Sequence, residues 1–326
     1  MGLLQNGEWV DQWYDTKSND GQFKREKSQV RGYITPHGAA GPDGHKGFKA
    51  ESGRYHLYVS YACPWAHRTL IFRRLKDLEE HITVSVVSPV MLENGWSFKR
   101  EEGSTGDSLF DSSFLHQIYT RHQKDYSGRV TVPVLWDKKT NQMVNNESSE
   151  IIRMFNESFN EITSNHTDFY PEEHHSAIDK INEKVYHNIN NGVYKTGFAT
   201  KQEVYEKEYK KLFETLDDIE AILADSRYLI DKVITEADWR LFTTLIRFDA
   251  VYYGHFKCNK KHIEDYPHLS NYVRELYQWP RIAETVDFEH IKKHYYFSHT
   301  MINPNQIIPV GPDIDYLSEH NRHKLL

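Results

Sequence analysis

A strand–helix–strand pattern within residues 55–87 constrains the fold of this 326-residue chain more than any other feature. Residues 55–60 alternate as a half-buried strand does, and residues 82–87 form a second run of strand-forming side chains. Between them, the apolar residues of 65–75 recur at helical spacing. Such a unit is usually parallel and right-handed. The pattern therefore predicts an α/β fold for the first half of the chain.

A cysteine lies where the first strand gives way to this helix. Cys63 precedes Pro64, which suits the first helical position because its missing N–H would be unpaired there anyway. The helix dipole and the free N–H groups stabilise a thiolate, so we expect the pKa of Cys63 to lie below the usual value of about 8.5. The fourth residue of the Cys-Pro-Trp-Ala window is Ala66, not a second cysteine. The pattern predicts a monothiol redox site that depends on an external thiol, and we expect the other cysteine, Cys258, to be inert.

Further strand and helix signals follow along the chain. Residues 130–136 and 143–144 add two strand candidates, and a helix is predicted to start within residues 146–149. Beyond residue 175 nearly every pattern is helical, with clear apolar periodicity at 204–223 and a capping-box pattern at Thr235–Asp238. A β-rich first half and an all-helical second half predict two domains.

The domain boundaries follow from these changes of pattern. We expect an extended N-terminal arm over residues 1–53, an α/β domain over residues 54–157 and an all-helical domain over residues 158–326. The arm is rich in Gly, Lys, Asp and Ser and lacks periodicity, so we expect it to wrap the first domain.

Composition excludes several classes of partner. A formal net charge of −7 argues against nonspecific binding to nucleic acid. No apolar stretch approaches the roughly 20 residues that cross a bilayer, so no membrane partner is expected. The N-terminus does not resemble a secretory signal, and two cysteines in a chain of this size favour reduced thiols in a cytoplasm. Nineteen histidines invite a metal hypothesis, but adjacent His174 and His175 would point different ways on a helix, and we expect no metal site.

Five motifs resemble one enzyme family. They are Cys63–Ala66, Glu93–Trp96, Gly128–Asp137, Asn190–Lys195 and His294–Tyr296. Together they are similar to the Xi class of glutathione S-transferases, the glutathionyl-hydroquinone reductases, and the likeness covers almost the full chain in order. The resemblance implies a thioredoxin-like N-terminal domain followed by an all-helical glutathione-transferase C-terminal domain. It also implies a cytoplasmic homodimer, for which the aromatic-rich segment 248–256 is a candidate interface.

The resemblance implies two sets of site residues. The catalytic set is Cys63, Tyr194, Tyr252 and Tyr295, and the glutathione-binding set is Trp96, Arg129, Val130, Thr131, Val132, Glu147 and Ser148. Tyr194 would act as a proton donor or acceptor beside the aromatic substrate, and the other two tyrosines would direct their hydroxyls toward the cysteine sulfur. Hydroxyl donors of this kind stabilise a thiolate.

The glutathione-binding residues also have a physical interpretation. Glu147 suits the ammonium group of the tripeptide, and Ser148 at a helix start suits the neighbouring carboxylate. Val132, before a proline that the resemblance implies is cis, offers its main chain to the cysteinyl backbone. The resemblance also implies that Trp96 contacts glutathione and that Arg129 binds one of its carboxylates.

The implied activity is the glutathione-dependent reduction of glutathionyl-hydroquinones, with glutathione as co-substrate and a mixed disulfide at Cys63 as intermediate. Two alternatives stay open at the level of sequence. One is an Omega-like thiol transferase that acts on dehydroascorbate or small disulfides, and the other is a non-catalytic binding module.

Overall fold

The computed structural model describes residues 2–101, 103–230 and 232–325. Its contacts divide the chain into two compact units. The first, here called the sheet unit, comprises Met1–Trp13, Glu26–Asp168 and Thr285–His294. The second, here called the helical unit, comprises Tyr14–Arg25, Phe169–Glu284 and Tyr295–Leu326. These units interleave along the sequence, whereas the boundaries expected from composition are consecutive; those boundaries stay a prediction.

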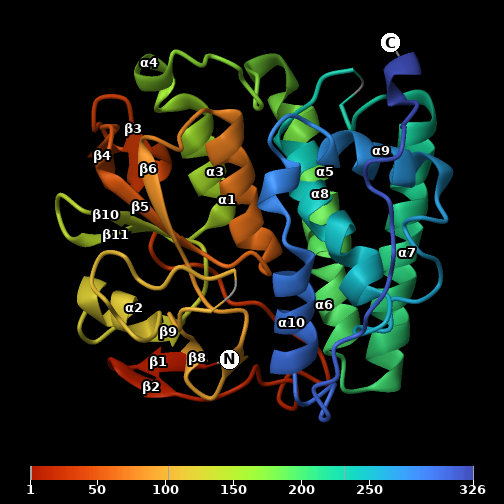
Figure 1. Ribbon diagram of the computed structural model, residues 1–326, viewed down its shortest axis with the longest axis horizontal. Helices are drawn as coiled ribbons and strands as arrows, with labels where there is room; N and C mark the ends of the chain where they lie inside the picture. Colours follow the sequence, from red (N-terminus) through yellow and green to blue (C-terminus); the bar gives the residue numbers. More distant parts are fainter. Residues whose placement is uncertain (1, 102, 231, 326) are drawn as a thin grey trace. The chain divides into compact units, whose positions relative to one another are not determined.

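A four-stranded sheet forms the centre of the sheet unit, in the order β11-β10-β5-β6. The strands are β5 (Tyr55–Val59), β6 (Ile82–Val86), β10 (Val134–Asp137) and β11 (Gln142–Asn145). β5 and β6 are parallel and joined by α1 (Pro64–Leu75), while β10 runs antiparallel to both β5 and β11. Figure 1 shows α1 and α3 (Ser148–Glu157) side by side along the sheet. The predicted strand–helix–strand unit and the thioredoxin-like fold class are confirmed.

Short elements complete the sheet unit. They are β1 (Leu3–Gln5), β2 (Glu8–Val10), β3 (Tyr33–Thr35), η1 (Pro42–Gly44), β4 (Gly47–Lys49), β7 (Met91–Leu92), β8 (Gly95–Trp96), α2 (His116–His122), β9 (Gly128–Arg129) and α4 (Asn160–Thr163). β1 pairs with both β2 and β9, and β3 pairs with β4. The N-terminal arm is thus partly built into small sheets, whose strands of three residues are too short to give a periodic pattern.

The helical unit consists of helices and irregular segments. Its elements are η2 (Glu172–His174), α5 (His175–Val185), η3 (Tyr186–Asn190), α6 (Gly192–Gly197), α7 (Gln202–Asp225), α8 (Glu236–Arg247), η4 (Phe248–Tyr252), α9 (Pro267–Tyr277) and η6 (Arg322–Lys324). η5 (Ala283–Thr285) and α10 (Phe288–Ser298) contain residues of both units. The predicted capping box is present, because the Thr235 hydroxyl accepts from Ala237 N while the Asp238 carboxylate accepts from Thr235 N.

Burial corrects one expectation about the helical unit. Phe248, Tyr252 and Phe256 are fully buried within the chain, so these three rings are not available to a dimer partner, and Tyr253 is the half-buried aromatic residue of the segment 248–256. An aromatic-rich run without strict periodicity is compatible with both a core segment and an interface. In this protein most of its rings pack in the core.

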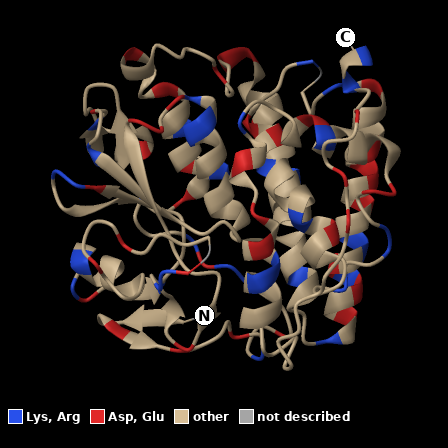
Figure 2. Ribbon diagram, viewed as in Figure 1, with Lys and Arg blue, Asp and Glu red and all other residues tan. Residues whose placement is uncertain are grey.

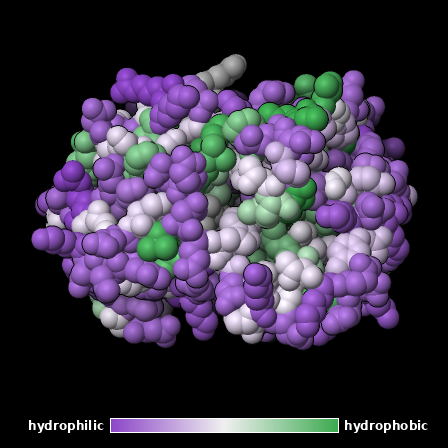
Figure 3. Space-filling view, turned by 90° about the horizontal axis from the view of Figure 1, so that it is seen from below, coloured by the Kyte–Doolittle hydropathy of each residue, from purple (hydrophilic) through white to green (hydrophobic). Residues whose placement is uncertain are grey.

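The charges and apolar groups of the surface are dispersed. Figure 2 shows Lys and Arg interspersed with Asp and Glu over both units. The face drawn in Figure 3 is mostly hydrophilic, with hydrophobic side chains in small groups. Among the described residues, most of the large apolar side chains that are well exposed lie in the C-terminal segment, at Met301, Ile307, Ile308, Val310 and Leu317. Every helix that the structure describes is too short or too polar to cross a membrane.

A buried histidine makes the stability of the sheet unit depend on pH. His56 on β5 is inaccessible to solvent, and its Nδ1 lies 2.7 Å from the Thr83 hydroxyl on the paired strand β6. Burial lowers the pKa of His56 to about 3, from an ordinary value of 6.5. The unfolded chain therefore takes up a proton at this residue between pH 6.5 and 3 while the folded chain does not, and stability is lost as the pH falls through that window.

We predict that lowering the pH from 7.5 to 5 costs about 2 kcal/mol of folding free energy through His56 alone. The His56→Gln variant should lose this part of the pH dependence, whatever its stability at pH 7.5. Urea unfolding followed by tryptophan fluorescence at both pH values measures the difference. His37→Gln, at an exposed position of the same unit, is the control. Equal pH dependence in His56→Gln and the parent protein would show that another group is responsible.

Candidate functional site

The cysteine of the sheet unit occupies the N-terminus of α1. Cys63 is the N-cap residue, with an extended backbone, and Pro64 takes the first helical position. The Cys63 carbonyl accepts a hydrogen bond from His67 N at 2.9 Å, so the helix starts directly after the cysteine. The side chain is partly exposed, and Sγ donates to the Val132 carbonyl at 3.6 Å. The predicted placement at the end of a strand and the start of a helix is confirmed.

The segment opposite this thiol is irregular backbone before β10. Val130, Thr131 and Val132 lie outside the strands, and the Val132–Pro133 bond is cis. In the described part of the chain the Val132 N–H has no hydrogen-bond partner, so it is available to a ligand backbone. A free N–H beside a loop of this kind suits an extended peptide that adds to the sheet.

One residue that the sequence interpretation missed holds this segment in place. The Tyr119 hydroxyl donates to the Thr131 carbonyl at 2.8 Å and accepts from Thr131 N at 3.2 Å. The Asn146 amide donates to the same hydroxyl at 3.2 Å. Tyr119 is buried on α2, and no sequence signal separates it from the other 20 tyrosines. Its three bonds fix the backbone next to Val132.

The second helix N-terminus of the sheet unit carries Glu147 and Ser148. Glu147 is the N-cap of α3, and its Oε1 accepts from Ser149 N at 3.1 Å. The Ser28 hydroxyl donates to its other oxygen at 3.1 Å. Ser148 is only 3% exposed, and its hydroxyl has no hydrogen-bond partner among the described residues. An unpaired buried hydroxyl at a helix N-terminus suits a carboxylate ligand.

The arm engages Arg129. The Arg129 guanidinium donates to the carbonyls of Gln12 and Trp13 and lies 3.4 Å from the Glu26 carboxylate. The side chain is mostly buried. The structure therefore ties this predicted ligand-binding residue to the N-terminal arm.

Trp96 is positioned by the β7–β8 hairpin. Its ring stacks on His294 with centroids 4.6 Å apart and an angle of 19° between the planes. Gly95 in front of it has a φ of +70°, and a Cβ there would lie 2.6 Å from the Trp9 ring. The Trp9 indole N–H donates to the Glu93 carbonyl at 2.9 Å. The Glu-Asn-Gly-Trp motif thus forms a tight turn that glycine alone fits well.

The three predicted tyrosines meet in the helical unit. The Tyr295 hydroxyl lies 2.6 Å from that of Tyr194 and 3.1 Å from that of Tyr252. Tyr252 ends η4 and stacks on Phe256 with centroids 5.4 Å apart. All three rings are buried. The structure brings together three hydroxyls from residues that are 43 to 101 positions apart in the sequence, and we call them the tyrosine cluster.

Burial sets the protonation of this cluster. It raises the pKa of Tyr252 and of Tyr295 well above the ordinary value near 10, and the neighbouring Tyr194 hydroxyl raises both further. Both phenols therefore carry their protons at neutral pH. Linked hydroxyls in this state can donate a proton and pass it along the cluster.

The histidines of α10 and the second cysteine lie in environments that do not favour metal binding or nucleophilic chemistry. His290 and His294 stand four residues apart on α10, but their ring nitrogens lie near the Ser60 hydroxyl (3.3 Å) and the Pro89 carbonyl (2.9 Å). In the part of the chain that is described, no group of three His, Cys, Asp or Glu side chains is arranged to hold a metal ion. Cys258 is inaccessible, and burial raises the pKa of its thiol far above the usual range.

Comparison with known families gives two matches in chain order. The family model "Glutathione S-transferase, N-terminal domain" matches residues 62–158, and "Glutathione S-transferase, C-terminal domain" matches residues 202–275. Together they cover more than half of the chain, and they coincide with the cysteine-bearing α/β region and with helices α7 to α9.

Individual relatives are similar over nearly their whole length. Glutathionyl-hydroquinone reductase YqjG of Escherichia coli (strain K12) is 54% identical, covering 99% of this chain and 98% of its own. Glutathionyl-hydroquinone reductase PcpF of Sphingobium chlorophenolicum is 51% identical, covering 96% of both. The glutathione-bound structure of YqjG superposes with a TM-score of 0.92 over 99% of both chains. The Xi class enzyme of Natrialba magadii superposes with a TM-score of 0.93 at 46% identity, over 100% of this chain and 98% of its own.

We predict that the two thiols differ in reactivity because one is partly exposed at a helix N-terminus and the other is sealed in the helical unit. In the native protein, iodoacetamide should label Cys63 and leave Cys258 unmodified. Unfolding in guanidinium chloride should make both react. Peptide mass spectrometry after each treatment measures the two sites separately. Equal labelling of both thiols in the native state would contradict the structural assignment.

Proposed function

The chain belongs to the Xi class of the glutathione S-transferase family, and on that premise we propose that it removes glutathione from glutathionyl-hydroquinones with a second glutathione as reductant. The observation that carries the proposal is the single thiol at the N-terminus of α1, with Ala66 where a dithiol site has its second cysteine. A lone thiol in this position favours attack on a sulfur atom and a mixed disulfide that an outside thiol resolves.

Glutathione binding is assigned to the sheet unit. We propose that Glu147 accepts from the ammonium group and that the Ser148 hydroxyl, at the N-terminus of α3, donates to the adjacent carboxylate. The unpaired N–H of Val132 would bond the cysteinyl carbonyl of the ligand. The buried and unpartnered Ser148 hydroxyl supports this assignment.

The other glutathione contacts follow from the family motifs. We assign Trp96 and Arg129 to the ligand, together with the loop that holds Val130 and Thr131. Because the Arg129 guanidinium is already bonded to the Gln12 and Trp13 carbonyls, it would approach a ligand carboxylate with a fixed orientation.

The first chemical step forms a disulfide. The Cys63 thiolate attacks the sulfur that joins glutathione to the aromatic ring, an S–S bond forms and the S–aryl bond breaks. The electron pair of the broken bond stays with the ring carbon, which takes a proton. The product is the free hydroquinone, the ring carbon has been reduced, and the two sulfurs have been oxidised to a mixed disulfide.

We assign the proton of this step to the tyrosine cluster. Tyr194 is the proposed donor to the ring carbon, and Tyr295 and Tyr252 would replenish and orient its proton. The linked hydroxyls support this role, because Tyr295 lies within hydrogen-bond distance of both Tyr194 and Tyr252.

The second step is thiol–disulfide exchange. A second glutathione thiolate attacks the glutathione sulfur of the mixed disulfide, which releases the Cys63 thiolate and oxidised glutathione. Because this step consumes reduced glutathione, we propose that the enzyme works in a reducing cytoplasm.

We also propose a homodimer, and the exposed apolar side chains of residues 301–317 support an interface in that segment.

We predict that Cys63→Ala loses at least about a thousandfold in kcat/KM for a glutathionyl-hydroquinone, since no other described thiol is accessible to form the mixed disulfide. Hydroquinone release followed by liquid chromatography measures it. Cys258→Ser, away from the proposed chemistry, should keep most of the activity. Dehydroascorbate serves as the competing substrate, and faster turnover of it than of the conjugate would favour an Omega-like transferase. A fully active Cys63→Ala enzyme would refute the mechanism.

We predict that Ser148→Ala raises the KM for glutathione about 10-fold or more, because a hydrogen bond to a charged carboxylate contributes about 1.5–3 kcal/mol. Steady-state rates at varied glutathione and saturating conjugate give this constant. Ser113→Ala, an exposed serine of the same unit, is the matched control and should keep the parent KM. An unchanged KM in Ser148→Ala would remove this residue from the binding site.

A further inference from the structure

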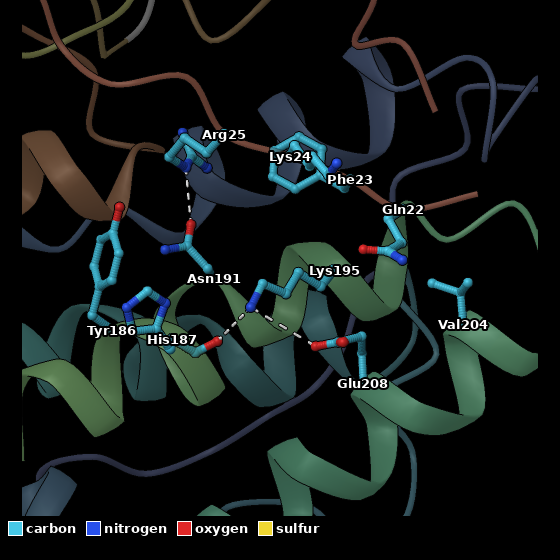
Figure 4. A pocket seen from close by; sticks show the side chains of 10 residues that line it. All are labelled: Gln22, Phe23, Lys24, Arg25, Tyr186, His187, Asn191, Lys195, Val204 and Glu208. Carbon is cyan, nitrogen blue, oxygen red and sulfur yellow. Dashed lines mark hydrogen bonds and ion pairs between the residues drawn. The ribbon is translucent and has the colours of Figure 1, made fainter. Parts of the chain in front are cut away.

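The helical unit contains a pocket that the proposed reaction leaves unused. Its volume is about 320 Å³, within the range of small-molecule sites. Its walls come from arm residues 22–25, from η3, from the start and middle of α6 and from α7, all within the helical unit (Figure 4). We call it the arm pocket, and the residues that matter for its chemistry are Phe23, Arg25, Tyr186, Asn191, Lys195 and Glu208.

The arm segment is fixed to the helices that form the other walls. The Arg25 Nε donates to the Asn191 side-chain oxygen at 3.0 Å, and Thr200 N donates to the Gly21 carbonyl at 3.1 Å. Lys201 and Asp20 form an ion pair beside them. These contacts give part of the N-terminal arm a specific place, so the pocket has an anchored wall.

The charges around the arm pocket favour an anion. Lys24, Arg25 and Lys195 are cationic, while Glu208 is the one carboxylate in the described lining. The Lys195 ammonium lies 3.9 Å from Glu208 and donates to the His187 carbonyl at 3.0 Å. Burial lowers the pKa of Lys195, so a bound anion would stabilise its charged form.

Asn191 supplies a donor for that anion. Its side chain is 5% exposed, and its oxygen is identified by the bond it accepts from Arg25. In the described part of the chain its amide nitrogen has no hydrogen-bond partner, and Figure 4 shows that nitrogen directed toward Tyr186 at the pocket wall. An accessible N–H at the pocket wall that no protein group accepts from can donate to an acceptor on a ligand.

The pocket is also adjacent to the tyrosine cluster. The Arg25 guanidinium lies 5.1 Å from the centroid of the Tyr194 ring and 5.6 Å from that of Phe23. Phe23 in turn stacks on Tyr194 at 6.2 Å. Arg25 and Phe23 therefore contact both the pocket and the proposed proton donor, and aromatic walls of this kind suit the side chain of a ring substrate.

We propose that the arm pocket binds a carboxylate carried by the aromatic part of the substrate, so that the enzyme prefers conjugates of hydroquinones with an acidic side chain. Arg25 and Lys195 provide the positive charge, and Asn191 provides a directed donor. The substrate preference rests on the proposed function. Binding of a carboxylate in the arm pocket can be measured without turnover.

The kinetic test compares two matched substrates, the glutathionyl conjugates of (carboxymethyl)hydroquinone and of its methyl ester. The parent enzyme should show a kcat/KM at least about tenfold higher for the conjugate of the acid than for that of the ester. A factor of about ten corresponds to the free energy of one hydrogen bond to a charged group. Asn191→Asp keeps the acceptor for Arg25 but repels a carboxylate, and Lys195→Gln removes a charge. Each should lower the acid-to-ester ratio about tenfold.

Lys184→Gln is the control, since Lys184 pairs with Asp218 on the exposed surface and does not line the pocket. It should keep the parent ratio. A parent ratio near one, or an unchanged ratio in both pocket variants, would overturn the proposal. A Lys184→Gln ratio that falls as far as that of Lys195→Gln would also overturn it, because bulk charge would then explain the preference.

A second measurement separates this inference from the proposed function. Titration calorimetry with free (carboxymethyl)hydroquinone requires no reaction, and its affinity should fall about tenfold or more in Asn191→Asp. If the enzyme fails to reduce any conjugate but this affinity falls as expected, the proposed function is wrong and the carboxylate site stands. If conjugates are reduced but parent and variant bind the acid equally, the carboxylate site is wrong and the reaction stands.

Discussion

The functional geometry of the sheet unit depends on two helix N-termini that emerge from one sheet. A helix N-terminus presents backbone N–H groups that have no partner within the helix, and its dipole attracts negative charge. Cys63 is the N-cap of α1 and Glu147 is the N-cap of α3, where the buried Ser148 hydroxyl has no hydrogen-bond partner among the described residues. The same physical feature therefore favours a thiolate at one place and a carboxylate ligand at the other, which is the arrangement that the proposed reaction requires. Packing of α1 against α3 on the sheet fixes the two relative to each other.

The helical unit contributes by burial rather than by charge. Tyr252 and Tyr295 are held away from solvent, and this burial raises the pKa of both phenols well above the ordinary value near 10. Their hydroxyls satisfy one another through Tyr295, so the cluster avoids the cost of an unpaired buried polar group. The π-helical turn η4 that ends at Tyr252 gives this hydroxyl a position on the helix that regular α-helical spacing would not.

The N-terminal arm makes hydrogen bonds to residues that we assign to binding in each unit. Ser28 donates to Glu147, the Gln12 and Trp13 carbonyls hold Arg129, and Arg25 bonds to Asn191. Each of these contacts is a hydrogen bond to a polar group. The arm also adds to the hydrophobic core, because Leu4, Phe23 and Ile34 are buried. It therefore combines apolar packing with the orientation of charged side chains.

Local sequence determined the β5–α1–β6 unit, the helical second half, the capping box at Thr235 and the single thiol at a helix start, because periodicity and capping depend on neighbours within a few positions. The family motifs added the three tyrosines, which spacing alone does not distinguish among 21. Only the tertiary structure decided that Tyr119 holds the Thr131 backbone, that segment 248–256 is core, and that Arg25 reaches Asn191. These depend on contacts such as Arg25–Asn191, between residues 166 positions apart, and on burial, and neither leaves a pattern in adjacent residues.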